Sequence, residues 1–197
     1  MAKRLFDFTI AMAGLILAIP AIIIIALAIK VDSPGPVFFR QKRVGRYGKI
    51  FLIHKFRTMV EADTDHGPLI TAGNDARITR IGRILRKYKF DEIPQLIDVI
   101  LGNMSLVGPR PEIPQYVSYY PEEQKSIVQT IRPGITDAAS IEFRNENEIL
   151  GQSKDPHKTY IEVILPIKLQ YYMEYVKKRS LIGDICIIVK TLTVIGR

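Results

Sequence analysis

The feature that most constrains this chain is an uncharged, apolar run of 22 residues, from Phe8 to Ile29. As a straight helix rising ~1.5 Å per residue it would be ~33 Å long, enough for a hydrocarbon core of ~30 Å. The run offers no polar face, so it does not fit a helix buried in a soluble protein. It is too long for a signal peptide, and no A-x-A-like cleavage site precedes Lys30. The run therefore predicts a helix embedded in a membrane.

Pro20 lies near the middle of this run and leaves two membrane topologies open. A mid-helix proline cannot donate its amide and displaces a carbonyl one turn earlier, so we expect a kink. As helices, residues 8–19 and 21–29 would each cover about half of a bilayer. Cations flank both ends, and the positive-inside rule keeps both flanks on the cytoplasmic side. A kinked span and a re-entrant helix, which dips into one leaflet and returns, both stay open. The flanking cations are Lys3, Arg4 and Lys30.

The composition excludes several classes of protein. With 47% hydrophobic residues and a net charge of +8 over 197 residues, the chain is not intrinsically disordered. A single cysteine, Cys186, excludes an internal disulfide and a thiolate zinc cluster, and three scattered histidines argue against a histidine-only metal site. No domain boundary is evident after residue 30. We therefore expect a membrane-embedded segment at 1–30 and one domain over 31–197.

A β-hairpin is predicted directly after the membrane segment. Val37–Gln41 and Lys49–Phe56 have strand character, and the glycines of Val44–Gly48 suit a hairpin turn. The stretch Arg40–Arg57 contains seven cations and no acid. Such a cluster is either a solvated charged face or, after a membrane segment, a contact for anionic lipid headgroups or phosphate ligands.

The remainder of the chain is predicted to be mainly helical. Arginines recur at every third position from Arg77 to Arg86, interleaved with apolar residues, which indicates an amphipathic helix with an arginine stripe. Glu61–Asp75 is polar and predicts a loop. Leu181–Ile195 is largely apolar and predicts a helix that lies in the membrane interface or packs as core. The other predicted helices cover Pro94–Leu101, Glu122–Gln129 and Tyr160–Lys178.

Asp91 and Glu92 form a pair of carboxylates just before the helix that starts at Pro94. One alternative is structural: Asp91 caps the helix and Glu92 is a first-turn acid, together worth ~1 kcal/mol. The other is chemical, because neighbouring helical side chains point ~100° apart and cannot do identical work. One carboxylate would face a substrate and the other would hold a hard cation such as Mg²⁺. Upstream arginines and Arg110 would then neutralise a diphosphate.

Arg110 lies between two prolines in the segment Gly108–Pro111. Both prolines restrict the backbone, so this arginine would lose little entropy on binding a phosphate or a nucleotide. The alternative is a rigid loop with a solvated cation. Arg132–Thr136 is a second stiff turn that carries a cation. The sequence contains no P-loop, dinucleotide fingerprint or Ser-His-Asp arrangement.

Several ordered motifs together resemble one family. The apolar segment with its central proline is followed at compatible spacing by Lys55-Phe-Arg-Thr-Met59, Asp91-Glu-Ile-Pro-Gln-Leu96, Met104-Ser-Leu-Val-Gly-Pro-Arg-Pro111 and Arg132-Pro-Gly-Ile-Thr136. This order resembles the bacterial sugar transferase family, the small monotopic phosphoglycosyl transferases that start membrane-linked glycan assembly. The resemblance covers essentially the whole chain.

The resemblance implies an enzyme that transfers a sugar-1-phosphate from a UDP-sugar to a polyprenyl (undecaprenyl) phosphate and releases UMP. It implies Mg²⁺ as cofactor and a covalent two-step route. Asp91 would be the nucleophile that forms an aspartyl-phosphosugar intermediate, and Glu92 would be the Mg²⁺ ligand. The substrate-binding residues that it implies are Lys55, Arg57 and Arg86 around the diphosphate, and Pro109, Arg110 and Pro111 on the nucleotide side.

The family fold implied is α+β and mainly helical. Its parts are an N-terminal re-entrant membrane helix broken at Pro20, a short β-hairpin and amphipathic interface helices around a cytosolic catalytic core. The implied location is the cytoplasmic face of a bacterial inner membrane. The expected partners are the UDP-sugar donor, the polyprenyl phosphate acceptor and membrane phospholipids, with a homodimer or downstream glycosyltransferases left open.

Two departures from the family pattern limit what is carried over. Ile19 precedes Pro20 where many members have serine, and Asp137–Asn145 stands where many continue with a Gly-Trp-Ala-Gln-like stretch. The sugar is therefore not assigned. The alternative function is a non-catalytic membrane-anchored scaffold whose basic surface binds anionic lipid or a glycan-assembly enzyme. Nucleic-acid binding is not expected, because no aromatic stacking positions accompany the cations.

Overall fold

The computed structural model describes residues 1–60, 73 and 75–194, and within them it is mainly helical with two small two-stranded sheets. The helices are α1 (Ala2–Asp32), α2 (Arg80–Lys87), α3 (Gln95–Leu101), α4 (Pro114–Val117), α5 (Glu122–Val128), α6 (Ala138–Glu142), α7 (Glu146–Gly151), α8 (Pro156–Thr159), α9 (Leu165–Lys178) and α10 (Leu181–Val194). The strands are β1 (Phe38–Val44), β2 (Ile50–Phe56), β3 (Ser105–Val107) and β4 (Gly134–Thr136). Short turns of other helix types are η1 (Arg46–Gly48), η2 (Phe90–Glu92) and the π-helix η3 (Tyr160–Ile164).

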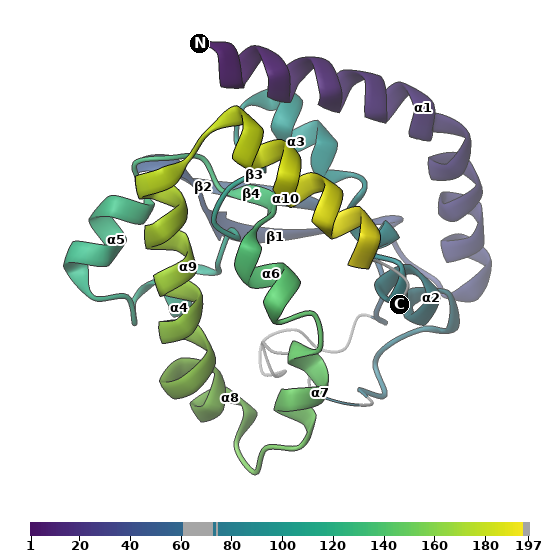
Figure 1. The fold of residues 1–197 in the computed structure, drawn as a ribbon. Helices are drawn as coiled ribbons and strands as arrows, with labels where there is room; N and C mark the ends of the chain where they lie inside the picture. The colour runs from purple at the N-terminus through teal and green to yellow at the C-terminus, as the bar shows by residue number, and fades with distance from the viewer. Residues whose placement is uncertain (61–72, 74, 195–197) are drawn as a thin grey trace.

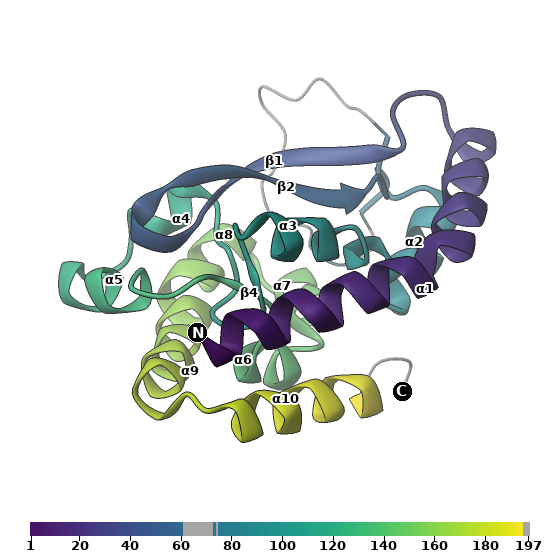
Figure 2. The same cartoon turned by 90° about the horizontal axis from the view of Figure 1, so that it is seen from above.

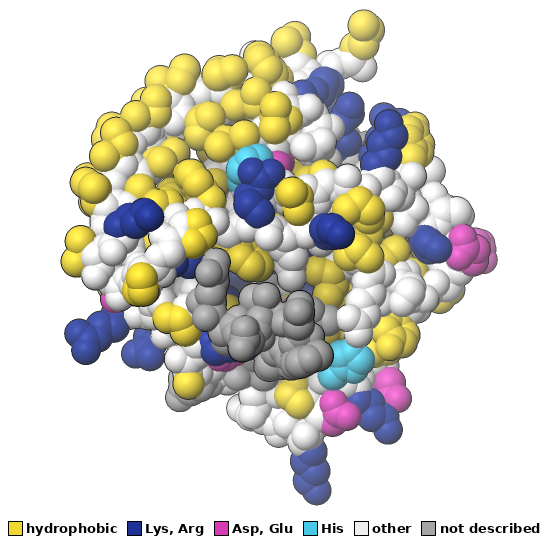
Figure 3. Space-filling model, turned by 180° about the vertical axis from the view of Figure 1, so that it is seen from behind, with side chains coloured by type: hydrophobic (Ala, Val, Ile, Leu, Met, Phe, Trp, Pro, Cys, Tyr) yellow, Lys and Arg dark blue, Asp and Glu magenta, His cyan; other side chains and the backbone are white. Residues whose placement is uncertain are grey.

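The helix α1 runs over the top of the molecule and down one side, and its ribbon bends sharply near the middle (Figure 1; Figure 2). Pro20 lies inside this helix, and a bend is what a mid-helix proline imposes. Among the described residues, α1 is the one helix long and apolar enough to cross a membrane. Hydrophobic side chains form a band over it on the outside of the molecule (Figure 3). Large exposed ones are Ile16, Leu17, Ile19, Ile23, Ile24 and Leu27. This uncovered apolar surface indicates membrane association.

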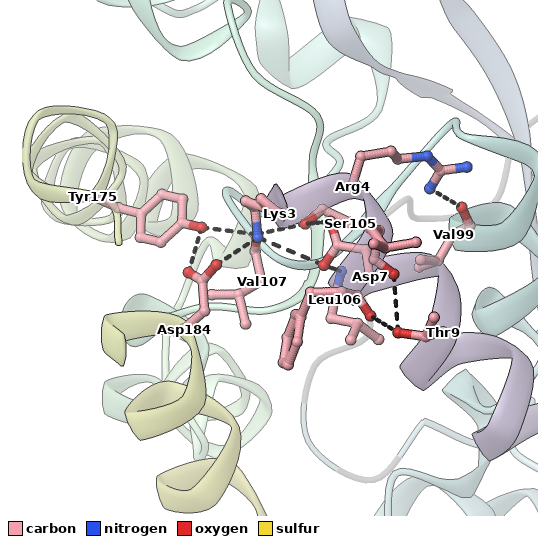
Figure 4. A network of polar contacts seen from close by, with 12 residues as sticks. Lys3, Arg4, Asp7, Thr9, Val99, Ser105, Leu106, Val107, Tyr175 and Asp184 are labelled. Carbon is pink, nitrogen blue, oxygen red and sulfur yellow. Dashed lines mark hydrogen bonds and ion pairs between the residues drawn. The ribbon is translucent and has the colours of Figure 1, made fainter. Parts of the chain in front are cut away.

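The N-terminal end of α1 is bound to the rest of the protein by charged groups. Lys3 Nζ donates to Asp184 Oδ2 on α10 at 2.6 Å, and Asp7 Oδ2 accepts from Ser105 Oγ on β3 at 2.8 Å. Figure 4 shows Lys3 reaching toward Asp184 and Tyr175. Asp7 and Asp184 are both buried. This end of α1 is therefore fixed to two elements that are distant in sequence.

The C-terminal end of α1 is bound to the same body. Asp32 Oδ2 accepts from the Ile81 amide of α2 at 3.0 Å, and Ile29 packs in a buried cluster with Phe56 and Leu85. The side chain of Thr79 and the Ile81 amide lower the pKa of Asp32. Both ends of the apolar helix thus contact one body, and the exposed middle lies between them.

The predicted hairpin is confirmed, with a first strand longer than expected. β1 and β2 pair antiparallel from Phe38↔Phe56 to Val44↔Ile50. The turn between them needs left-handed backbone, at Tyr47 (φ 58°) and Gly48 (φ 73°). β1 continues beyond Gln41 because Lys42, Arg43 and Val44 stay paired with Leu52, Phe51 and Ile50.

The helices α2 and α3 frame the turn η2. Thr79 caps α2 by accepting from the Gly82 amide at 2.9 Å, so the helix starts at Arg80 rather than at Arg77. A Cβ on Gly82 would overlap the carbonyl of Thr58, which explains a glycine inside α2. The helix α3 ends at Gly102, whose left-handed φ of 83° is a common C-terminal cap.

The strands β3 and β4 form a parallel pair that the sequence did not predict, with Ser105 opposite Gly134 and Val107 opposite Thr136. A Cβ on Gly134 would overlap the backbone of Gly108. The two segments therefore lie closer together than any residue with a side chain at position 134 would allow. This close contact joins the two stiff turns found in the sequence.

The C-terminal half is more divided than predicted. The expected helix Tyr160–Lys178 is present as η3 followed by α9, and the short helices α4, α6, α7 and α8 were not predicted. The expected loop Glu61–Asp75 lies almost entirely outside the described residues, as does Ile195.

Along α10, one face is uncovered, and its exposed apolar residues are Leu181, Ile182, Ile185, Val189 and Leu192.

Candidate active site

Asp91 and Glu92 lie in η2, the short 3₁₀ turn directly before α3. Lys89 enters this turn in a left-handed conformation, with φ 56°. The N-cap of α3 is Pro94, and it makes no side-chain capping bond. The capping alternative for Asp91 is therefore wrong. Both carboxylates are 8% exposed, which is costly for charged groups unless their surroundings compensate.

Two cations from different parts of the chain hold Glu92. Lys55 Nζ on β2 lies 2.7 Å from Glu92 Oε1, and Arg110 Nη2, after β3, lies 2.8 Å from the same oxygen. Burial alone would raise the pKa of Glu92, but Arg110 and Lys55 outweigh it and hold that pKa well below its usual range. Glu92 raises the pKa of Arg110 in turn. Glu92 is thus a fixed, ionised carboxylate.

Asp91 is in the opposite state. Its Oδ1 is buried and, among the described residues, has no hydrogen-bond partner. Burial raises the pKa of Asp91, Lys55 opposes this shift, and the adjacent charge of Glu92 adds to it. A buried carboxylate oxygen without a partner is unusual, because native structures pair most such atoms. Of the two carboxylates, Asp91 is therefore the one with a buried oxygen that no described protein group occupies.

Arg86 lies near the two carboxylates and does not bond to them. Its Nε donates to Thr58 Oγ1 at 2.9 Å and its Nη2 contacts Met59 Sδ at 3.1 Å. Burial lowers the pKa of Arg86, and the charge of Asp91 is the largest influence that opposes this. Arg86 thus adds positive charge from a third direction.

The backbone on both sides of Arg110 is fixed, as its two prolines predicted. The carbonyl of Pro109 accepts from the Gly134 amide at 2.9 Å, and the carbonyl of Pro111 accepts from Arg43 Nη1 at 2.9 Å. The parallel β3–β4 pair and the hairpin therefore both position Arg110.

Arg57 lies apart from this cluster. It is buried, and its guanidinium donates to the carbonyls of Ser33 and Pro34, at the exit of α1. Its recorded bonds thus fix the C-terminal end of α1 to the end of β2, and none goes to Asp91 or Glu92. The fold thus brings together these sequence-predicted residues: Asp91, Glu92, Lys55, Arg86 and Arg110.

The family model for bacterial sugar transferases matches residues 1–197, the whole chain. The chain belongs to the bacterial sugar transferase family. Among curated relatives, a UDP-glucose:undecaprenyl-phosphate glucose-1-phosphate transferase of Xanthomonas campestris pv. campestris is 40% identical over 195 residues, covering 96% of this chain and 38% of the relative.

Two further relatives support the same placement in the family. A UDP-N-acetylgalactosamine-undecaprenyl-phosphate N-acetylgalactosaminephosphotransferase of Aeromonas hydrophila is 35% identical over 195 residues, covering 98% of the chain and 43% of the relative. An uncharacterized sugar transferase of Bacillus subtilis is 41% identical over 143 residues, covering 73% of the chain and 69% of the relative. The chain spans about two fifths of the first two relatives named.

The carboxylates of Asp91 and Glu92 fit a hard divalent cation. Among the described residues, no group of three or more metal-binding side chains occurs. Mg²⁺ does not require one, because it commonly takes one or two carboxylates and completes its shell with water and phosphate oxygens. Asp91 Oδ1 has no partner, and the recorded bonds to Glu92 all use Oε1. One oxygen of each carboxylate is therefore free to bind a cation.

Arg43 is a residue of this candidate site that the sequence did not single out. It fixes Pro111, burial lowers its pKa, and its Nε is buried without a partner among the described residues. The pairing of the hairpin places Arg43 four residues from Phe39, the partner of Lys55, and so on the same face as Lys55. The strand register could have indicated that Arg43 and Lys55 share a face, but the sequence alone did not distinguish Arg43 from the other six cations of this stretch.

Proposed function

We propose that this sugar transferase moves a sugar-1-phosphate from a UDP-sugar to undecaprenyl phosphate and releases UMP. The family match over the whole chain and the activities named for its relatives support this. The observation that carries the proposal is the buried, unpartnered Oδ1 of Asp91 beside Glu92, which Lys55 and Arg110 hold in place.

In the first step, an Asp91 carboxylate oxygen attacks the phosphorus that carries the sugar. A bond from this oxygen to phosphorus forms while the bond to the bridging oxygen breaks, and UMP leaves with that oxygen and its electron pair. The result is an aspartyl-phosphosugar intermediate. In the second step, an oxygen of undecaprenyl phosphate attacks the same phosphorus, and the Asp91 oxygen leaves with its bonding pair.

The cations of the site make this attack feasible. A carboxylate and a diphosphate repel each other, so the charge must be neutralised before they meet. Lys55, Arg86 and Arg110 supply positive charge from three elements that the fold holds rigid. Because burial raises the pKa of Asp91, Lys55 is also needed to keep its carboxylate ionised.

Glu92 would hold Mg²⁺ through Oε2, because the bonds from Lys55 and Arg110 both use Oε1, and Asp91 stays the nucleophile. When bound, Mg²⁺ would neutralise phosphate charge and stabilise the leaving UMP. The role of Lys55 and Arg110 is then to orient Glu92 so that only one of its oxygens faces the cation.

The membrane arrangement proposed here is re-entrant, with residues 1–30 embedded and 31–197 forming a catalytic domain at the cytoplasmic face of the inner membrane. The support is that both ends of α1 bond to one body, through Asp184 and Ser105 at one end and Ile81 at the other. A spanning helix would break one set of these bonds. The exposed apolar face of α10 would lie in the membrane interface.

The experiment is an assay of UMP release from a panel of UDP-sugars with undecaprenyl phosphate and Mg²⁺. We expect release by the full chain and loss of both release and covalent adduct in Asp91→Asn. The matched control is Asp155→Asn, because Asp155 is an exposed cap of α8 that asparagine can replace. A fully active Asp91→Asn would reject the nucleophile. A scaffold would release no UMP with any donor.

A further inference from the structure

A cavity lies beside the C-terminal end of α3, the opposite end from Asp91 and Glu92. It has a volume of about 360 Å³ and opens between the first turn of α1, the hairpin turn, the segment before β4 and the corner between α9 and α10. Neither Asp91 nor Glu92 lines it, and neither do Lys55 and Arg110. The cavity is therefore separate from the candidate active site.

The lining of this cavity carries an excess of positive charge. The cationic side chains that line it are Lys3, Arg4, Arg46, Arg132 and Arg179. Two carboxylates accompany these cations: Asp7, which lines the cavity, and the buried Asp184, which does not. Both are buried, and Lys3 contacts both, at 3.6 Å and 2.6 Å. The four arginines are left without a carboxylate partner among the described residues.

Part of this arginine cluster has a structural role. Arg4 donates to the carbonyls of Val99 and Ile100 at 2.5 and 2.9 Å, and Arg132 Nε donates to the carbonyl of Gly102 at 2.7 Å. These carbonyls end α3, where the helix dipole is negative, so Arg4 and Arg132 cap α3. Figure 4 shows Arg4 reaching toward Val99, away from Lys3.

The caps leave other donors unused. Among the described residues, the Nη atoms of Arg132 have no recorded acceptor, and Arg179 has no recorded bond. Arg46 donates its Nε to the carbonyl of Thr130, and its guanidinium lies over the Tyr47 ring at 4.3 Å, which leaves its Nη atoms without a recorded acceptor among the described residues. Burial and then the charges of Arg4 and Arg46 lower the pKa of Arg132. Like charges are thus crowded here beyond what capping α3 requires, and an anion would relieve the repulsion.

We propose that this cavity binds the phosphate group of an anionic lipid headgroup, with Arg46, Arg132 and Arg179 as its donors. Guanidinium groups suit phosphate because they donate two parallel hydrogen bonds and stay charged. Leu181 also lines the cavity and starts the exposed apolar face of α10, while α1 carries exposed apolar residues from Leu5 onward. The cavity therefore opens between the two elements best suited to contact a membrane, where headgroup phosphates are concentrated.

The test uses the full chain in detergent and two probes, phosphatidylglycerol and inorganic phosphate, with bound lipid counted by native mass spectrometry. Phosphatidylcholine is the zwitterionic comparison. The variant is Arg46→Gln/Arg179→Gln, which spares both caps of α3. The matched control is Arg144→Gln/Lys154→Gln, which removes the same charge at exposed positions elsewhere. Equal melting temperatures of the two variants establish that both are folded.

We expect the wild type to retain phosphatidylglycerol in preference to phosphatidylcholine, and the Arg46/Arg179 variant to bind it at least about tenfold more weakly than the control does. If inorganic phosphate binding alone shows this loss, the phosphate site stands and its source is a soluble phosphate rather than a lipid. If the variant binds both probes as well as the control does, the proposal is overturned.

Discussion

Asp91 and Glu92 are adjacent in sequence, yet their surroundings drive their pKa values in opposite directions. Arg110 and Lys55 hold Glu92 ionised, while burial and the charge of Glu92 raise the pKa of Asp91. Two carboxylates with separated pKa values are typical of sites in which each has a different task. In the proposed reaction, Glu92 provides fixed charge and Asp91 is the nucleophile.

The lowered pKa of Glu92 predicts a specific dependence of stability on pH. The comparison is between Asp91→Asn and Asp91→Asn/Glu92→Gln, so that the coupling to Asp91 is removed. At pH 7 the double variant should be less stable by about 2–4 kcal/mol, because Lys55 and Arg110 lose their partner. The pKa of Glu92 in the folded state lies below the ordinary 4.5. The extra stability of Asp91→Asn over the double variant should therefore fade as the pH falls below 4.5 toward the lowered pKa.

The measurement is chemical unfolding of the two proteins in detergent over a pH series. A stability difference that stays constant from neutral pH to well below 4.5 would contradict the electrostatic explanation. The ordinary value for comparison is that of an unperturbed glutamate.

Gly134 shows how one residue can determine a long-range contact. In Gly134→Ala the new Cβ would overlap the backbone of Gly108, forcing β3 and β4 apart beside Arg110. We expect a loss of at least about 3 kcal/mol in stability. The matched control is Gly14→Ala, whose Cβ would meet only Leu96 Cδ1 at 3.5 Å and should be tolerated. Thermal unfolding of both variants checks this, and equal melting temperatures would refute it.

At the scale of elements, local sequence patterns predicted the helices and strands whose formation depends on neighbouring residues. The hairpin, the apolar helix and α3 follow from alternation, hydropathy and a proline at a helix start. The parallel β3–β4 pair could not be predicted, because three-residue strands carry no periodic signal and their pairing joins segments far apart in sequence. The same holds for the candidate site: local motifs indicated Asp91, Glu92 and Arg110, each within its own segment.

The sequence could not indicate how Arg57 and Arg132 are used. Arg57 bonds to the exit of α1, and Arg132 caps α3. Both roles depend on which carbonyl ends of distant helices come near, and no motif spacing contains that information. The division of the expected helix Tyr160–Lys178 at η3 has the same origin, since a π-helical turn depends on the packing around Tyr160 and Ile164.

The element α1 yields a direct topological prediction. In a Cys186→Ser background, Ala2→Cys should resist a membrane-impermeant maleimide in intact spheroplasts and react in inverted vesicles. The control is Lys154→Cys in the same background, because Lys154 is exposed on the part of the protein that follows α1 and should label in the same pattern. Labelling of Ala2→Cys but not of Lys154→Cys in spheroplasts would establish that α1 spans the membrane.

At the scale of the whole molecule, the pair Lys3–Asp184 joins residues 181 apart in the sequence. Asp184 is fully buried and also accepts from the Tyr175 hydroxyl at 2.7 Å. Asp184→Asn should cost about 1–3 kcal/mol, because it leaves Lys3 with only the longer contact to Asp7. Melting temperature and proteolysis near the N-terminus are the measurements. The control is Glu174→Gln, an exposed partner of Lys178 on α9 that should change little.

The Asp184 prediction fails if the two variants melt together. It also fails if Asp184→Asn melts early without any new cleavage near α1, since the pair is expected to hold that end of the helix against α10.

The attachment of α1 at both ends has a consequence for the order of synthesis. The partners of its first turn lie in α3, β3 and α10, so the last of them is translated roughly 180 residues after Lys3. At about 5–20 residues per second, on the order of ten to forty seconds pass between the synthesis of Lys3 and that of Asp184, its partner on α10. During that interval the N-terminal end of α1 lacks its bond to α10. The bent form held at both ends is then a late product of biogenesis, reached after the ribosome has completed α10.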